Sequence, residues 1–351
     1  MSGATAGGVL SAGIRESEIE TKRGITMILG RRQAVRLCAA LVATGMLLAA
    51  GLAAGPAEAN QLGTYKGNGT TGRSRIPGFE SWLGREIVRA LDFVSFGSSW
   101  TNMVSSAVYV AHSWDGGRWR LAVSVPMLPA DGKSTLKQGA TGAYNTYFKQ
   151  IAVTLVGHGL GNSVIRLGWE FNGTWFPWSA YKCPTCFVQF WRQIVTTMRA
   201  VPGAQFHFDW CPDLGYNMIA SDTVYPGDAY VDLIGLDVYN QSWDRSVTTP
   251  EGRWSRLMNQ SFGLKWQAEF AAAHRKWLSF PEWATGVWTG SPGVGGGDDP
   301  YFIQHMSDWM KAHSVGYNNY FDVQGSFRSQ LSNNQYPKSA ALFRKLFLPQ
   351  P

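Results

Sequence analysis

The chain alternates short β-branched or aromatic runs with longer amphipathic segments, and this repeat constrains its fold more than any other feature. Such runs are typical of buried strands, whereas the segments between them have helical periodicity. Strands that alternate with helices pair in parallel. Eight strands are expected after residue 60, at residues 62–67, 91–97, 119–128, 163–170, 204–210, 233–239, 276–283 and 317–323.

Amphipathic helices are expected between these strands. They are predicted at residues 143–159, 186–201, 255–276, 301–314 and 339–347. Eight such units in roughly 290 residues fit a (β/α)8 barrel, and no linker or low-complexity stretch divides them. We therefore predict the α/β class, with a single TIM barrel domain over residues 60–351.

Composition and charge are consistent with one large enzyme-sized domain. Hydrophobic residues make up 45% of the 351 residues and charged residues 16%, which is enough apolar surface for a barrel core. Without its first 59 residues the chain has 25 basic and 20 acidic residues, so the formal charge falls from +7 to +5. Because no basic run accompanies this excess, a nucleic-acid partner is not expected.

The first 59 residues have the pattern of an export signal. The basic segment GRRQAVR precedes the apolar run Leu37–Gly55, and AEA before Asn60 resembles a signal-peptidase site. Residues 1–59 are therefore predicted to be a signal peptide with an upstream segment, Met27 being an alternative start. The paired arginines allow twin-arginine as well as Sec export. A secreted or periplasmic protein follows from this, with an uncleaved anchor as the alternative.

The cysteines are consistent with an oxidising destination. Removal of the signal leaves Cys183, Cys186 and Cys211. At most one disulfide is expected within the chain, either Cys183 to Cys186 or one of these to Cys211, with one thiol left free. A zinc site at CPTC is the alternative, but no second cysteine pair or histidine cluster supplies the other ligands. Neither a metal nor a cofactor is expected.

Two of the expected strands end in a glutamate. Catalytic residues of (β/α)8 barrels stand at the C-terminal ends of the strands, and Glu170 ends the fourth strand while Glu282 is near the end of the seventh. Alternation of side chains along the fourth strand places Arg166 on the inward face with Glu170 and directs Trp169 toward the helices. The same rule turns Tyr239 of the sixth strand inward. The sequence thus predicts one pocket with two carboxylates and a tyrosine.

Paired carboxylates in an aromatic-rich cleft can cleave glycosidic bonds. One is protonated and gives its proton to the leaving oxygen, while the other is ionised and attacks the anomeric carbon or activates water. Burial and a neighbouring negative charge are expected to raise the pKa of the acid, and a hydrogen bond from Tyr239 to keep the nucleophile ionised. The alternative for either glutamate is an ion pair at the barrel rim, with Arg166 as a partner.

Tryptophans are candidates for sugar-binding surfaces, because the C–H faces of a pyranose ring can stack on an indole. The chain has 16 of them. Packing in the core or between barrel and helices is the alternative for each. The candidates for binding are Trp175, Trp178, Trp210, Trp283 and Trp288.

Other polar residues near the strand ends have weaker signals. Asn172 either contacts a sugar or caps a turn in its loop. Asp237 either binds sugar hydroxyls or lies buried in an ion pair with Arg166. Asp209 is expected to face away from the pocket, and Asp213 to reach its rim.

The segments RLGWEFNGTWFPW, FDWCPD, LIGLDVYN and FPEW, in strand order, resemble glycoside hydrolase family 26 and the wider clan of retaining (β/α)8 hydrolases. The resemblance runs from about Leu62 to the C-terminus and is specific at these four segments. It implies that Glu170 is the general acid/base and Glu282 the nucleophile. It also implies that Tyr239 orients the nucleophile.

The same resemblance implies a function. Trp210, Trp175 and Trp178 would line the cleft, and Trp169 stands where the β-mannanases of the family have a histidine. The expected activity is that of an exported retaining glycosidase, endo-acting on a β-linked polysaccharide such as mannan, β-glucan, xylan or a bacterial exopolysaccharide. The expected partner is therefore a polysaccharide or oligosaccharide.

Two other classes of function are compatible with this sequence. A noncatalytic polysaccharide-binding protein on a degenerate barrel would keep the tryptophans, and an exopolysaccharide assembly factor could use the same exported fold. Transglycosylation would use the same residues as hydrolysis. After signal removal the protein is expected to be a monomer that is not inserted in a membrane.

Overall fold

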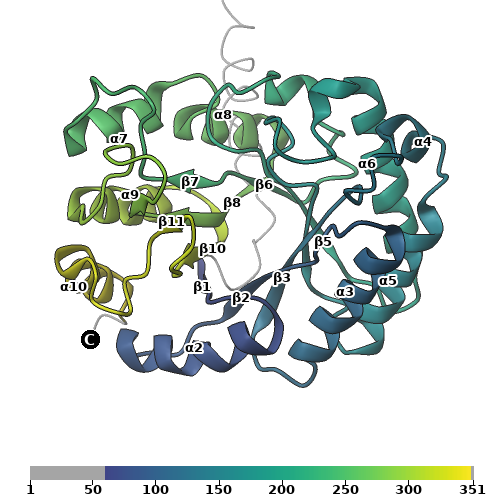
Figure 1. Ribbon diagram of the computed structural model, residues 1–351, viewed down its shortest axis with the longest axis horizontal. Coiled ribbons are helices and arrows are strands. Elements are labelled where there is room, and N and C mark those ends of the chain that lie inside the picture. The colour runs from purple at the N-terminus through teal and green to yellow at the C-terminus, as the bar shows by residue number, and fades with distance from the viewer. Residues whose placement is uncertain (1–59, 349–351) are drawn as a thin grey trace, which may run out of the picture. The chain divides into compact units, whose positions relative to one another are not determined.

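Eight parallel strands close into a barrel in the computed structural model, which describes residues 60–348 (Figure 1). The strands pair in the order β10-β1-β2-β3-β4-β5-β6-β8, and β10 also pairs with β8, which closes the barrel. The predicted (β/α)8 fold is confirmed. The strands are β1 Gln61–Tyr65, β2 Arg89–Phe93, β3 Arg120–Val125, β4 Val164–Leu167, β5 His207–Trp210, β6 Leu233–Gly235, β8 Trp277–Ala284 and β10 Val315–Phe321.

Helices surround the barrel, with the connections expected of βα units (Figure 1). The predicted signal peptide at residues 1–59 lies outside the described residues. None of the helices within residues 60–348 is long and apolar enough to span a bilayer. The helices are α2 Gly69–Leu83, α3 Trp100–Trp114, α4 Leu136–Ala140, α5 Asn145–Gly157, α6 Pro184–Arg199, α7 Pro250–Asn259, α8 Leu264–His274, α9 Pro300–Ala312 and α10 Pro337–Phe347, with the 3-10 turns η1 Ala180–Lys182 and η2 Ser221–Val224.

The helix predicted at residues 255–276 is wrong as a single element, because α7 and α8 are separate. Phe262, between them, has φ 58°, a left-handed conformation that a bulky residue rarely adopts. A Cβ added to Gly263 would lie 2.5 Å from the carbonyl oxygen of Leu257, so only glycine fits this turn. The apolar periodicity continues through the break and hides it.

Short strands beyond the barrel build its mouth. The strand β7, Val238–Tyr239, continues the direction of β6 after a two-residue interruption and pairs with β8. The strands β9, Val287–Trp288, and β11, Phe327–Arg328, form an antiparallel pair in the loops that follow β8 and β10. These pairings brace the loops at the C-terminal ends of the barrel strands.

The two faces of the barrel wall differ in chemistry. Ile165 and Leu167 of β4 belong to the apolar cluster that includes Phe148 of α5 and Ile194 of α6. Between them in sequence, Arg166 is fully buried on the inner side of the wall, where it forms ion pairs. The alternation predicted for these three residues of β4 is therefore confirmed. The barrel interior contains buried charge, which needs partners.

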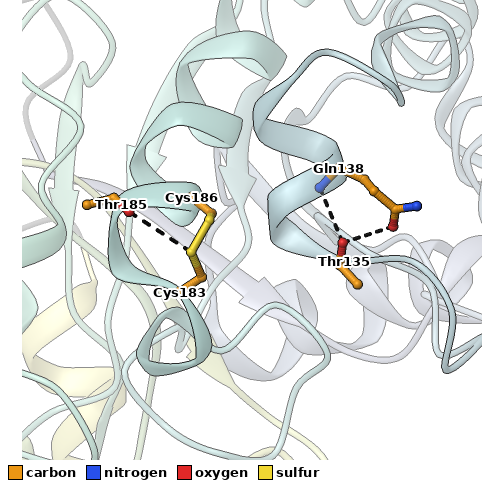
Figure 2. The surroundings of a disulfide bond; sticks show 5 residues. All are labelled: Thr135, Gln138, Cys183, Thr185 and Cys186. Carbon is orange, nitrogen blue, oxygen red and sulfur yellow. Dashed lines mark hydrogen bonds between the residues drawn. A yellow bond between two sulfur atoms is a disulfide. The ribbon is translucent and has the colours of Figure 1, made fainter.

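A disulfide joins Cys183 to Cys186 where α6 begins, with 5.2 Å between their Cα atoms (Figure 2). Of the pairings left open by the sequence, the local one is present. Figure 2 also shows the start of α4, where the Thr135 hydroxyl accepts from the backbone N–H of Gln138. The bridge closes a loop of one helical turn and therefore constrains only the entry to α6.

The third cysteine of the described chain, Cys211, is a buried thiol. Its Sγ lies 3.3 Å from the Asp237 Oδ1. Burial raises the pKa of this thiol well above its ordinary value, so it stays protonated and donates to the carboxylate. No cluster of three metal-ligating side chains occurs within residues 60–348.

Candidate active site

Glu282, on β8, has both carboxylate oxygens held by donors. Arg166 Nη1 donates to its Oε1 over 2.5 Å, and the Tyr239 hydroxyl donates to its Oε2 over 2.5 Å. The glutamate is only 6% exposed. A cationic donor and a phenol thus fix the orientation of one carboxylate at the end of its strand.

Arg166 connects this carboxylate to the barrel interior. Its Nη1 also donates to the Ser124 hydroxyl over 3.1 Å, and its Nη2 pairs with Asp237. Burial alone would lower the pKa of the guanidinium, but Asp237 and Glu282 outweigh this and raise it well above its ordinary value. Of the two interpretations of Asp237, the buried ion pair is the one observed.

Glu170 lies at the same mouth of the barrel, but on a turn that follows its strand and not on the strand itself. The fourth strand ends at Leu167, three residues earlier than predicted, and both Gly168 and Glu170 have left-handed backbones, with φ of 49° and 51°. A Cβ at Gly168 would lie 2.5 Å from the Sδ of Met127. The Glu170 N–H donates to the carbonyl of Cys211 over 2.8 Å. A locked turn, and not strand alternation, therefore directs this side chain.

The environment of Glu170 favours its protonated form. Burial raises the pKa of this carboxyl to about 8, and the negative charges of Asp213 and Glu282 act in the same direction. Arg166 and a hydrogen bond from Trp175 Nε1, 2.6 Å from its Oε2, oppose the shift only in part. A carboxyl of this kind holds a proton at neutral pH and can deliver it.

The two glutamates share one hollow of about 290 Å³. Three of its aromatic residues are the last residues of neighbouring strands, Tyr65 of β1, Phe93 of β2 and Phe321 of β10. The sequence interpretation missed them, although an aromatic residue at the end of an expected strand is a visible signal. The hollow is lined by Tyr65, Asn68, Phe93, Trp169, Glu170, Phe176, Glu282 and Phe321.

Trp169 was expected to face the helices, and this expectation is wrong. It lines the hollow that contains both glutamates, and its ring packs edge-on against Phe93 and Phe176 at 5.4 and 5.0 Å between centroids. The left-handed residues on either side of it end the alternation of the strand. The indole therefore forms part of the wall beside the carboxylates.

A second hollow of about 390 Å³ opens on the side of Glu170. Two predicted tryptophans lie there. Trp175 is 50% exposed, and Trp288 is partly buried, with its Nε1 donating to Gln241. The residues around this second hollow are Glu170, Trp175, Asp213, Asn217, Tyr239, Gln241, Trp243 and Trp288.

Two other predicted tryptophans face the helices and do not line the cleft. Trp210 is fully buried and packs on Phe270 of α8 at 5.7 Å between centroids. Trp283 is fully buried and stacks on Phe343 of α10 at 5.8 Å. Each lies next to an inward-facing acid on its strand, and adjacent strand residues point to opposite faces. Their predicted role in sugar binding is therefore wrong.

Trp178 is also fully buried and was wrongly expected in the cleft. Its ring stacks on Phe176 at 4.5 Å, and its Nε1 donates to the carbonyl of Trp169 over 2.9 Å. It supports the wall of the first hollow from behind. Its loop carries several aromatic residues, and the sequence alone does not tell which of them reach the surface.

Asp209 faces the barrel interior, against the prediction that it points away. Its Oδ2 accepts from the Ser279 hydroxyl at 2.7 Å and from Tyr317 at 2.5 Å. Burial raises the pKa of this carboxyl to about 6, with both hydrogen bonds opposing the shift. Since Asp209 pairs in register with Arg166 of β4, the two residues share the inner face. Asp209 lines neither hollow and serves packing within the barrel.

Asn172 braces two loops and does not face the cleft. It is fully buried. Its Oδ1 accepts from the N–H of Asp213 at 2.9 Å, and its Nδ2 donates to the carbonyls of Asp213 and Gly215 at 2.8 and 3.2 Å. With its side-chain polar atoms occupied by backbone, it has no role in sugar contact. It holds the loop after β5 against the loop after β4.

This brace places Asp213 beside Glu170, as the second carboxylate of the second hollow. Burial raises the pKa of Asp213 to about 7, against a hydrogen bond from Asn217. Asp213 follows the end of β5 by three residues, as Glu170 follows the end of β4. The sequence interpretation missed this shared spacing, because it placed the end of the fourth strand at Glu170 and not at Leu167.

Comparison with known proteins gives a fold and, for part of the chain, a similarity to one family. Residues 117–267 match the family model described as glycosyl hydrolase family 26. Similar solved structures include a modular endo-β-1,4-mannanase from Cellulomonas fimi, 18% identical over 81% of this chain and 71% of that one, with a TM-score of 0.55.

Two further mannanases have the same overall structure. A β-mannanase of family 26 from Bacteroides ovatus is 15% identical over 83% of this chain and 88% of its own, with a TM-score of 0.57. A Bacillus subtilis mannanase is 17% identical over 85% and 89%, with a TM-score of 0.56. At these identities the structures establish the fold, and the family model covers the strand that leads to Glu170. The chain is therefore a (β/α)8 barrel that resembles glycosyl hydrolase family 26 over residues 117–267.

Proposed function

We propose that this chain is an exported retaining endo-β-glycanase in which Glu282 is the nucleophile and Glu170 the general acid/base. The observation that carries the proposal is the contrast between the two carboxyls of one hollow. Glu282 is held at both oxygens by Arg166 and Tyr239, whereas burial raises the pKa of Glu170 to about 8. One group is equipped to attack and the other to give a proton.

The reaction follows from these two states. A Glu282 oxygen attacks the anomeric carbon while Glu170 protonates the departing glycosidic oxygen, which leaves a glycosyl ester on Glu282. Glu170, now ionised, removes a proton from water, and the water oxygen displaces Glu282 from the same carbon. Each step inverts the carbon, so the product keeps the original configuration. This mechanism requires roughly 5 to 5.5 Å between the two carboxyl groups.

Arg166 and Tyr239 are assigned positioning roles. The guanidinium balances the buried charge of Glu282, and the phenol fixes the second oxygen. Because a buried charge without a partner is costly, the ion pairs with Glu282 and Asp237 also offset the burial of Arg166. No cofactor takes part in this mechanism.

The proposed substrate is a β-linked polysaccharide. The structural relatives described as mannanases support this class, and the aromatic walls of both hollows suit pyranose rings. Trp169 occupies the position of the histidine expected in β-mannanases, so mannan, mixed-linkage glucan, xylan and bacterial exopolysaccharide all belong in the test panel. The signal-like segment at residues 1–59 supports secretion or periplasmic export of the enzyme.

The test is release of reducing ends from this panel by the exported protein, with Glu170→Gln and Glu282→Gln beside it. We expect Glu170→Gln to lose activity by about 10²- to 10⁴-fold, the usual contribution of a general acid, and Glu282→Gln to fall to background. The exposed Glu269 of α8 supplies the matched control, Glu269→Gln, which keeps the parent rate.

An aryl glycoside with a good leaving group separates the two roles. Because such a group needs little protonation, Glu170→Gln should lose much less kcat/KM on it, since kcat/KM reports formation of the glycosyl enzyme. Glu282→Gln should lose as much as before. Equal losses for both variants would contradict the assignment. Tight binding of one polysaccharide without turnover by the parent would favour a binding or assembly protein.

A further inference from the structure

Large exposed aromatic side chains gather on one side of the candidate site. Within residues 60–348 both of the tryptophans that are at least half exposed, Trp175 and Trp243, border the second hollow, with 50% and 61% of their surface exposed. Tyr216, 60% exposed, lies farther along the same side, in a hollow that it shares with Trp243. Exposed apolar side chains that gather in one place often mark a binding site.

The loop that carries Trp243 is held in place by its neighbours. The Ser242 N–H donates to the carbonyl of Val294 over 2.9 Å, and the side chain of Gln241 accepts from Trp288 at 2.5 Å. The rings of Trp243 and Trp288 lie 6.1 Å apart at 41°. The most exposed tryptophan of the region is thus fixed beside a tryptophan of the second hollow.

Tyr216 is supported by the unusual turn between α7 and α8. Its ring lies 6.1 Å from that of Phe262 at 35°, and the Gly215 N–H donates to the carbonyl of Phe262 over 3.0 Å. Phe262 itself has the left-handed backbone that costs a bulky residue about 1 kcal/mol or more. The turn therefore contacts the loop of this exposed tyrosine through one ring pair and one backbone hydrogen bond.

The position of Glu170 shows which part of a substrate this side would receive. The acid faces the departing oxygen, so the sugars beyond that oxygen extend past Glu170. The second hollow contains Glu170 and Trp175 but not Glu282. The adjoining hollow then leads from Asp213 to Tyr216 and Trp243. Polysaccharide on this side belongs to the leaving group.

We propose that Trp243 and Tyr216 form a distal platform that binds the leaving portion of a β-linked polysaccharide, beyond the sugars next to the scissile bond. The inference rests on the proposed function and extends it. Flat pyranose faces would stack on these two rings, and polar side chains of Gln260 and Arg256 in the same hollow are placed to meet hydroxyl groups. Long chains are therefore the preferred substrates.

The test compares long and short substrates. For Trp243→Ala and Tyr216→Ala, the ratio of kcat/KM on the polysaccharide to kcat/KM on its own trisaccharide should fall about tenfold, the effect of losing one aromatic contact. Tyr181→Ala removes an exposed aromatic side chain that borders neither hollow, and its ratio should equal that of the parent. Equal losses on both substrates, or no loss, would overturn the platform.

Binding distinguishes this inference from the proposed function. Affinity electrophoresis in gels with linear β-mannan, mixed-linkage β-glucan or xylan measures retention of the Glu282→Gln protein with and without Trp243→Ala. If the parent cleaves nothing but retention depends on Trp243, the hydrolase proposal fails and the platform stands. If Glu282→Gln binds none of these glycans, or binds equally well without Trp243, the platform is excluded.

Discussion

At the scale of residues, the site depends on backbone conformation as much as on residue type. Glutamates at two strand ends could be predicted from the sequence, because barrel chemistry lies there. The direction of Glu170 could not be predicted in the same way. Alternation assumes an extended chain, whereas Gly168 and Glu170 have φ of 49° and 51°. This turn also moves Trp169 from the helix side into the wall of the hollow.

Asp213 gives a prediction about pH. Since Glu170 donates its proton, kcat/KM should fall as the pH rises through about 8, the pKa to which burial and its negative neighbours raise it. Asp213→Asn removes one of those negative charges, so the pKa of Glu170 should drop and the alkaline limb should move to lower pH. The measurement is a pH profile of kcat/KM for both proteins.

The exposed Asp308 of α9 supplies the control for charge alone, and Asp308→Asn should leave the profile where it is. An unmoved alkaline limb in Asp213→Asn would show that Asp213 does not act on Glu170. A limb displaced to higher pH would contradict the sign of the electrostatic effect.

At the scale of elements, the order and type of strands and helices were predictable, but boundaries and faces were less so. Helix 255–276 is two helices because Phe262 and Gly263 break a periodicity that continues across them. On β5, the sequence HFDW allows either face to be inward. Pairing with Arg166 of β4 settles this in favour of Asp209, since neighbouring strands in register share faces.

A buried and an exposed tryptophan near the site are expected to respond differently to replacement by alanine. Trp210→Ala removes a fully buried indole and should lower the free energy of unfolding by about 3–5 kcal/mol. Trp175→Ala removes a half-exposed indole that donates to Glu170, and should lower activity with little loss of stability. Urea denaturation followed by circular dichroism checks both. A Trp210→Ala protein that is stable but binds sugar poorly would show that Trp210 lines the cleft, contrary to this account.

At the scale of the whole molecule, the barrel brings four distant segments to one mouth. Glu170 follows β4, Asp213 follows β5, Tyr239 ends β7 and Glu282 lies on β8. Because these segments follow neighbouring strands of the barrel, the pocket could be predicted from the order of the strands in the sequence. The sequence could not separate cleft tryptophans from packing tryptophans, because both kinds occur beside the same strand ends and only the exposed surface distinguishes them.

Covalent trapping tests the central claim most directly. In a 2-deoxy-2-fluoro-β-glycoside of the sugar identified in the substrate panel, the fluorine slows both displacements, while a good leaving group such as dinitrophenolate keeps the first one fast. The glycosyl enzyme then accumulates. Mass spectrometry of the digested protein should then find one sugar on the peptide that contains Glu282. Turnover of the natural substrate with no adduct, or with the sugar on another carboxylate, would contradict the assignment of Glu282 as nucleophile.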